Sequence, residues 1–126
     1  MRILLIGADG QLGTDLQKAI SRSELTPLTI SDIDVTNKSS ISTIINKYKP
    51  DVVINTSAYH RVDDCEDNRD KAFAVNAEGV KNLCLACKDA GAALVHISTD
   101  YVFDGKKGKP YIETDRPNPE TVYGLK

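Results

Sequence analysis

Three regularly spaced glycines follow a short apolar run at the start of the chain. The run, Ile3 to Ile6, has the character of a strand buried on both faces, and Gly7, Gly10 and Gly13 follow it in the pattern G-x-x-G-x-x-G. An apolar stripe with helical spacing comes next: Leu12, Leu16, Ala19 and Ile20. Between a strand and a helix, such glycines let the backbone turn tightly and approach a pyrophosphate at the helix N-terminus. The segment predicts a dinucleotide-binding turn; the alternative is that the glycines serve only the turn itself.

The alternation of strand and helix continues along the chain. Further strands are expected at 25–30, 52–55 and 93–97, and Pro27 makes the first of them irregular or places it near an edge. Strands spaced in this way, with helices between them, imply parallel βαβ units with right-handed crossovers. The predicted fold is therefore an α/β, Rossmann-like doubly wound parallel sheet, with the strands in the spatial order 2-1-3-4.

The expected helices have clear apolar stripes. One stripe, with Asn37 or Ser39 as the expected N-cap, contains Ile41, Ile44, Ile45 and Tyr48. A longer helix, expected to end near Gly91, contains Ala72, Phe73, Asn76, Val80, Leu83, Cys84 and Cys87. The residues after the fourth strand read as a loop, until a last helix is expected to begin within 120–123.

Composition narrows the possible partners. The 126 residues are 40% apolar and 27% charged with a formal net charge of −2, so neither nucleic acid nor an anionic membrane is expected as a partner. The opening apolar run is too short for a membrane span and lacks a signal-peptide core, so we expect a cytoplasmic protein. Cys65, Cys84 and Cys87 do not suggest disulfides, and we interpret Cys84 and Cys87 as buried apolar residues, with no metal site.

Polar residues stand where the third and fourth strands end. The segment Asn55 to His60 follows one strand and Ser98-Thr99-Asp100 follows the other, at the edge where ligands bind in open parallel sheets. The Thr99 hydroxyl can donate a hydrogen bond to a substrate carbonyl oxygen. Asn76 either satisfies the backbone of a strand or, as the family resemblance given below implies, orders water in the site. We interpret the acidic segment 63–67 as a solvated turn in preference to a substrate-binding element.

The run from Ser98 to Gly105 (STDYVFDG), followed by Tyr123-Gly124, resembles the dTDP-4-dehydrorhamnose reductase family of extended short-chain dehydrogenases/reductases when it is taken together with the glycine turn. The resemblance extends over residues 1–126. It implies that these residues are a partial NAD(P)-binding Rossmann domain, that the C-terminal substrate-binding region is absent from the chain, and that the chain alone is inactive. It further implies reduction of the C4 ketone of dTDP-4-dehydro-L-rhamnose by NADPH or NADH, for polysaccharide biosynthesis.

The resemblance also implies the site residues. Tyr123 is the proton donor and Thr99 its catalytic partner, and Thr99 and Asp100 contact the dTDP-sugar substrate. The residues expected to contact the cofactor are Gly7, Gly10, Gln11, Leu12, Gly13, Asp34, Val35, Ala58, Tyr59, His60, Ile97 and Tyr123.

Two features of the family pattern cannot be completed from the sequence. The Thr29-Ile30-Ser31 segment, expected to face the 2′ position of the adenosine ribose, holds neither the Asp that favours NAD nor the Arg that favours NADP. A tyrosine pKa of about 10 calls for a lysine one helical turn away to lower it. Lys126 is at position +3 from Tyr123, and we expect the family's +4 lysine at residue 127.

Two rival functions share these motifs. One is a non-catalytic, NADP-binding regulatory subunit resembling that of methionine adenosyltransferase, and the other is an NAD-dependent sugar-nucleotide epimerase. The STDYVF run favours the reductase over the epimerase but does not separate the reductase from the regulatory subunit. A homodimer and a Mg²⁺ ion are compatible with the full-length family, and neither can be read from these residues.

Overall fold

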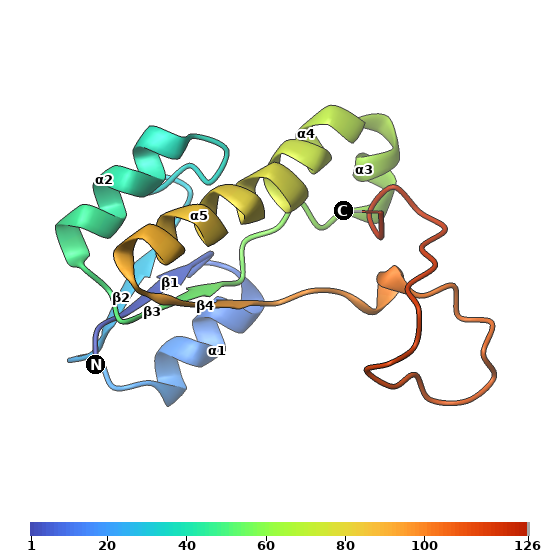
Figure 1. The fold of residues 1–126 in the computed structure, drawn as a ribbon, viewed down its shortest axis with the longest axis horizontal. Helices are drawn as coiled ribbons and strands as arrows, with labels where there is room; N and C mark the ends of the chain where they lie inside the picture. Colours follow the sequence, from blue (N-terminus) through green and yellow to red (C-terminus); the bar gives the residue numbers. More distant parts are fainter. Residues whose placement is uncertain (126) are drawn as a thin grey trace.

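A computed structural model describes residues 1–125, and Lys126 lies outside the described residues. Four parallel strands form one sheet in the order β2-β1-β3-β4, which confirms the predicted order (Figure 1). The strands are β1 (Ile3–Ile6), β2 (Leu25–Leu28), β3 (Val52–Asn55) and β4 (Ala93–His96). Pro27 lies in β2, an edge strand of this sheet, where its missing N–H costs no ladder bond on the solvent side.

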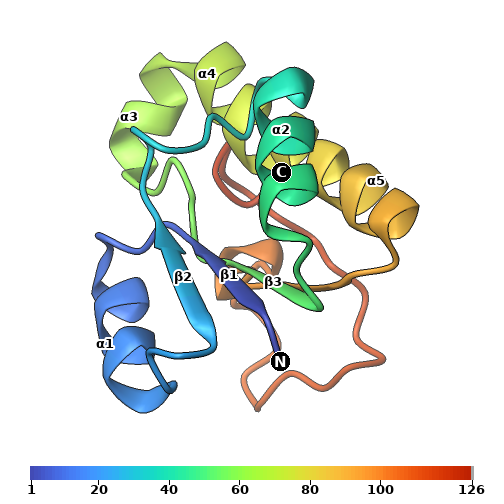
Figure 2. The same cartoon turned by 90° about the vertical axis from the view of Figure 1, so that its left-hand side faces the viewer.

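Helices cover the two faces of the sheet unequally (Figures 1 and 2). α2 (Lys38–Tyr48) and α5 (Val80–Ala90) lie on one face, and α1 (Gln11–Ala19) lies on the other. The main core forms under α2 and α5, where strand residues meet helix residues: Leu4, Ile6, Val53, Ile41, Ile45 and Leu83. α1 buries little of its own surface, since Leu12 remains 42% exposed.

The N-cap predicted for α2 is confirmed. The Asn37 side chain accepts hydrogen bonds from the amides of Ser39 and Ser40, at 2.9 and 3.3 Å. The helix ends at Lys49, which adopts a left-handed φ of 46°. Ser39, the alternative N-cap, lies inside the helix instead.

The long helix before β4 contains a π-helical turn that the sequence pattern did not predict. α4 (Arg69–Phe73) leads into the π-helix η1 (Ala74–Gly79) and then directly into α5, which ends at Gly91 as expected. The expectation that both cysteines of the C-x-x-C pair are buried is wrong for Cys84, which is exposed. Cys87 faces the sheet beside Leu83, and burial raises the pKa of its thiol to about 11.

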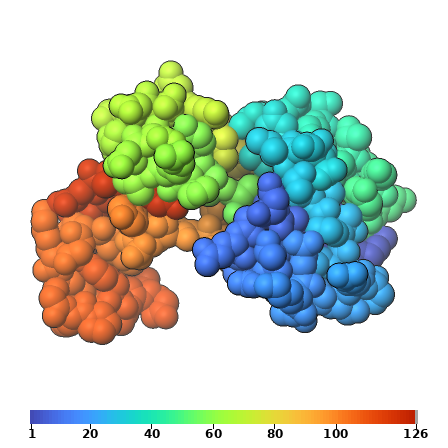
Figure 3. Space-filling view, turned by 180° about the vertical axis from the view of Figure 1, so that it is seen from behind, coloured from blue at the N-terminus to red at the C-terminus, as the bar shows by residue number. Residues whose placement is uncertain are grey.

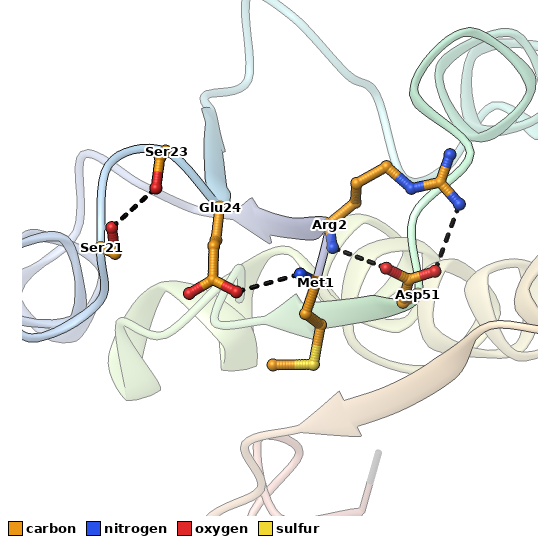
Figure 4. A network of polar contacts seen from close by, with 6 residues as sticks. All are labelled: Met1, Arg2, Ser21, Ser23, Glu24 and Asp51. Atoms are coloured by element: carbon orange, nitrogen blue, oxygen red, sulfur yellow. Dashed lines mark hydrogen bonds and ion pairs between the residues drawn. The ribbon is translucent and has the colours of Figure 1, made fainter.

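Ion pairs tie together the amino-terminal ends of the strands, opposite the edge where polar residues gather (Figure 4). The Met1 ammonium lies 3.0 Å from the Glu24 carboxylate. The amide and guanidinium of Arg2 donate to Asp51, at 2.6 and 3.2 Å, and these bonds lower the pKa of Asp51 below its ordinary value. Exposed pairs of this kind contribute little to stability.

One expectation for the segments around the sheet is wrong in part. Residues 63–67 form a short helix, α3 (Val62–Asp67), in place of a turn; Asp63, Glu66 and Asp67 are exposed as expected, but Cys65 is buried. Of the helix expected to begin within 120–123, the described residues contain one turn, in which the Leu125 amide donates to the Thr121 carbonyl oxygen at 3.1 Å. A single turn fixes several backbone dihedrals for one hydrogen bond and does not propagate by itself. Among residues 1–125, no helix has the length and apolar character needed to cross a membrane.

β4 has an uncovered apolar face and an edge that no other strand of the described sheet pairs. Val95 and Ile97, on the same side as α1, are 46% and 45% exposed. Apolar strand edges of this kind promote association between chains.

We therefore expect residues 1–126, prepared alone, to self-associate at micromolar concentration, and Val95→Lys to suppress that association because a charge on the open face opposes pairing. Light scattering measures the association, and chemical denaturation checks that the variant still unfolds cooperatively. Equal scattering from both chains would show that β4 is not the contact.

Candidate functional site

Backbone packs directly against backbone where β1 ends. Gly7 has a left-handed φ of 82°, and a Cβ there would lie 2.8 Å from both the amide nitrogen of Ser57 and the hydroxyl oxygen of Thr56. The Thr56 hydroxyl donates to the carbonyl oxygens of Ile6 and Gly7, at 2.9 and 3.1 Å. The glycine turn is thereby attached to the end of β3.

The other two glycines have different surroundings. A Cβ on Gly13 would clash with the carbonyl oxygen of Gly7 and lie 2.9 Å from Cα of Ala8, so Gly13 is what lets α1 approach β1. A Cβ on Gly10 would meet the same carbonyl oxygen at 3.3 Å, which is tight but tolerable. Gly10 is the exposed N-cap of α1, and Gln11 and Leu12 are exposed in its first turn. The first amides of α1 are therefore accessible to an anion.

The loop after β2, expected to lie beside the adenosine, is ordered by its own carboxylates. Asp32 accepts hydrogen bonds from the amide and hydroxyl of Thr29, at 2.8 and 2.9 Å, and these bonds lower its pKa. Asp34 accepts from the amide and hydroxyl of Thr36, at 2.9 and 2.7 Å. Val35 is buried against Gly79. Ile30, at the tip, is 84% exposed.

A small pocket of about 30 Å³ lies at the carboxyl ends of β3 and β4. Its lining residues are Ser57, Ala58, Asn76, His96, Ile97, Ser98, Thr99 and Tyr123. Four of the predicted site residues, Ala58, Ile97, Thr99 and Tyr123, therefore border one space although they come from three separate segments. Asp100, Tyr59 and His60, also predicted, are not among the lining residues.

A larger open groove, of about 680 Å³, lies between α1 and β2. Its lining residues are Thr14, Gln17, Lys18, Ile20, Arg22, Leu25 and Pro27, and none of them is a predicted site residue. We place the candidate site at the smaller pocket, because ligands of open parallel sheets bind at the carboxyl ends of the strands.

Asn76 holds the segment that follows β3. Its side-chain oxygen accepts from the Tyr59 amide at 2.8 Å, and its side-chain nitrogen donates to the Tyr59 carbonyl oxygen at 2.9 Å. This two-bond clamp comes from the π-helical turn, a local distortion that recurs at functional sites. Asn76 thus has the first of the two roles considered for it, because it bonds backbone polar groups. These groups belong to the loop after β3 and not to the strand itself.

A second buried amide orients the histidine of β4. Asn55 is 1% exposed, and its side-chain oxygen accepts from the amide and hydroxyl of Ser57, at 3.1 and 2.6 Å. Its side-chain nitrogen therefore faces Nδ1 of His96, at 3.2 Å, and donates to it. Desolvation lowers the pKa of His96 below its ordinary value, and a hydrogen bond with the backbone of Asn55 acts in the opposite direction. Sequence reasoning missed His96, because a polar residue inside an apolar strand gives no local signal of a partner on the neighbouring strand.

Thr99 and Tyr123 both border the pocket, but they make different contacts: Thr99 is held by hydrogen bonds and Tyr123 by ring packing. The Thr99 hydroxyl accepts from the Tyr101 amide at 3.2 Å, as the N-cap of the short helix η2 (Asp100–Val102), and donates to Asp100 at 3.3 Å. To donate to a ligand it must release Asp100. Tyr123 is half-buried and packs edge-to-face on Tyr101, with ring centroids 5.6 Å apart.

The glycine turn supports a paired prediction. Gly13→Ala should lower the free energy of unfolding by about 1–3 kcal/mol, because its methyl group overlaps backbone atoms. Gly10→Val should change stability less but abolish binding of NADPH and NADH, because its side chain occupies the approach to the first amides of α1. Chemical denaturation and calorimetric titration, in a full-length protein that carries this chain, measure the two effects. Unchanged affinity of Gly10→Val for both cofactors would contradict the assignment of the turn.

The Asn76 clamp gives a second prediction. Asn76→Ala leaves the amide and carbonyl of Tyr59 without these partners, so we expect a loss of about 1–3 kcal/mol in unfolding free energy and weaker cofactor binding. Asn68→Ala is the matched control, since the exposed Asn68 side chain also donates to a backbone carbonyl, at 3.1 Å from that of Asp64. If both variants bind NADPH equally well, Asn76 does not support the cofactor segment.

Comparison with known proteins supplies the family. The model described as the RmlD substrate binding domain matches residues 1–126. The dTDP-4-dehydrorhamnose reductase of Aggregatibacter actinomycetemcomitans is 44% identical, over 98% of this chain and 43% of that protein. The crystal structure of a dTDP-4-dehydrorhamnose reductase from Clostridium acetobutylicum superimposes with a TM-score of 0.96 at 45% identity, over 99% of this chain and 45% of that one.

A third relative was solved with a cofactor. The dTDP-4-dehydrorhamnose reductase from Bacillus anthracis, in complex with NADP, has a TM-score of 0.94 at 38% identity, over 98% of this chain and 45% of that one. These structures confirm the Rossmann-like fold class, and the chain spans less than half the length of each relative. Because the family model matches it from the first residue to the last, the chain belongs to the RmlD substrate binding domain family.

Proposed function

We propose that residues 1–126 supply the cofactor-binding part of an NAD(P)H-dependent sugar-nucleotide reductase, which converts dTDP-4-dehydro-L-rhamnose to dTDP-L-rhamnose. The observation that carries this proposal is that Thr99 and Tyr123 border the same pocket at the carboxyl edge of the sheet. The names of the relatives supply the substrate class.

The glycine turn is the proposed site of the cofactor's pyrophosphate, because the first amides of α1 are exposed beside Gly10. The NADP in the Bacillus anthracis relative makes NADPH the first cofactor to test, with NADH as the comparison. Asp34 and Val35 would lie beside the adenine, and Ala58 and Ile97 would lie near the nicotinamide end, since both border the pocket.

The proposed chemistry needs two hydroxyl groups. When bound, the cofactor supplies a hydride to C4 of the sugar. Thr99 turns its hydroxyl from Asp100 to the C4 oxygen and stabilises the charge that develops there. Tyr123 donates the proton to that oxygen. The two groups reach the pocket from different segments, so the fold, not the local sequence, brings them together.

The substrate-binding region belongs to the same proposal. This chain spans 43% of the Aggregatibacter enzyme, and we propose that the sugar and the dTDP are selected mainly by residues outside 1–126. A reductase assay of residues 1–126 alone is expected to show no turnover.

Tyr123→Phe in a full-length protein that carries this chain should reduce kcat by about 10²–10⁴-fold, because the ring and its packing remain while the transferable proton is lost. Cofactor affinity should stay nearly unchanged. Steady-state assays with NADPH and dTDP-4-dehydro-L-rhamnose measure kcat, and calorimetry measures binding.

The matched control is Tyr48→Phe, which removes a hydroxyl from a half-buried ring that packs beside the main core, away from the pocket. A wild-type protein that binds NADPH but does not reduce the sugar would favour the regulatory-subunit alternative. Near-normal turnover of Tyr123→Phe would remove Tyr123 from the chemistry.

A further inference from the structure

The chain leaves the pocket at Thr99 and returns to it at Tyr123, after a long excursion outside the sheet. Figure 3 shows these C-terminal residues, in orange and red, as a lobe that stands apart from the N-terminal residues in blue. We call residues 103–120 the strap. The strap contains no strand and no α-helix, so side-chain contacts must decide where its far end comes back.

The Asp104 carboxylate accepts three hydrogen bonds from other residues of the strap. Its Oδ1 accepts from the Tyr111 hydroxyl at 2.8 Å and from the Lys106 amide at 2.9 Å. Its Oδ2 accepts from the side-chain nitrogen of Asn118 at 2.8 Å. These three donors, of which the Asn118 side chain has the largest effect, lower the pKa of Asp104 to about 2, so the carboxyl group is ionised at neutral pH.

The contact with Asn118 closes the base of the strap. The backbone N–H of Asn118 also donates to the Val102 carbonyl oxygen at 2.9 Å. The two ends of the strap are therefore joined by one backbone hydrogen bond and one side-chain hydrogen bond. Ion pairs between Lys106 and Glu120 and between Lys107 and Asp115 add further links across the strap. Closing a loop of this length costs conformational entropy, which these bonds offset.

The closed base leads directly into the turn that holds Tyr123. The Val122 amide donates to the Glu66 carboxylate of α3 at 2.8 Å, and Val122 packs on Cys65. Gly124 lies so close to the Tyr101 carbonyl oxygen that a Cβ there would clash. The position of the Tyr123 ring beside Tyr101 is thus determined by contacts on both sides, and the Asp104–Asn118 bond is one of the contacts that bring the chain back to it.

We propose that Asp104 is a positioning residue, which places the hydroxyl of Tyr123 at the pocket by closing the strap through Asn118. The inference rests on the proposed function, because it acts through the proposed proton donor. It assigns Asp104 no contact with substrate or cofactor, since Asp104 does not line the pocket.

The test uses a full-length protein that carries this chain. Asn118→Asp replaces the side-chain donor with a second carboxylate, so the bond to Asp104 is lost and the two charges repel each other. We expect kcat to fall by about 10–100-fold, as for small misplacements of a reacting group, while the Kd for NADPH changes less than about twofold. Asp104→Ala should have the same effect. Glu113→Ala, which removes an exposed carboxylate from the same strap, is the matched control and should retain wild-type kcat.

An exchange of the two side chains tests the bond itself. In Asp104→Asn/Asn118→Asp, the amide of residue 104 can donate to the carboxylate of residue 118, while its oxygen still accepts from Tyr111 and Lys106. The double variant should recover most of the kcat lost in Asn118→Asp. Loss without recovery, with both proteins folded by circular dichroism, would overturn the proposal.

A double-mutant cycle separates positioning from general stability. If Asp104 acts through Tyr123, then Asp104→Ala should lower the residual kcat of Tyr123→Phe by less than about twofold. A full additional loss in that background, or kcat values of Asp104→Ala and Asn118→Asp equal to that of Glu113→Ala, would overturn the inference and leave the proposed function intact. An inactive wild-type protein, or an unaffected Tyr123→Phe, would overturn both.

Discussion

The close contact between the end of β1 and the start of α1 determines the geometry of everything that follows it. Gly13 allows that contact, and Gly7 allows the turn to press on Thr56 and Ser57. A side chain at either position would separate α1 from the sheet or the turn from β3. The glycine turn at the end of β1 would then shift relative to the pocket residues that follow β3. The order of the strands matters to the site mainly because it places β1 beside β3.

Much of the sheet could be predicted from the sequence, because its signals are local. The apolar runs, the glycine spacing and the stripe of α2 each occupy a few neighbouring residues, and they led to the correct strands, N-cap and strand order. The glycine turn and the strand ends were candidate sites for the same reason. The exposure of Cys84 was not foreseen, since a stripe of apolar residues does not tell which of two adjacent positions faces the sheet.

The parts that could not be predicted depend on contacts between distant residues. The residues around Asn76 do not predict its hydrogen bonds to Tyr59. Nor do those around Asn55 predict that His96 is its partner on the next strand. The position of Tyr123 at the pocket depends on the hydrogen bond from Asn118 to Asp104 and on the one from the Val122 amide to Glu66 of α3. The acidic segment is exposed as expected, but its helix and the hydrogen bond that Glu66 accepts were not predicted, because charge patterns alone do not reveal a backbone donor from elsewhere in the chain.

The π-helical turn also adjusts the rotation of one long helix between two packing surfaces. Ala72, before the turn, packs with Cys65 and Val122, whereas Leu83 and Cys87, after it, pack on the sheet. Each residue of an α-helix advances the side chains by about 100°, so an additional residue in one turn changes the angle between the two faces. A deletion of one residue within 74–79 would make the helix more regular, yet it would rotate one face out of register. A change in the length of this helix would therefore disturb two packing surfaces at once.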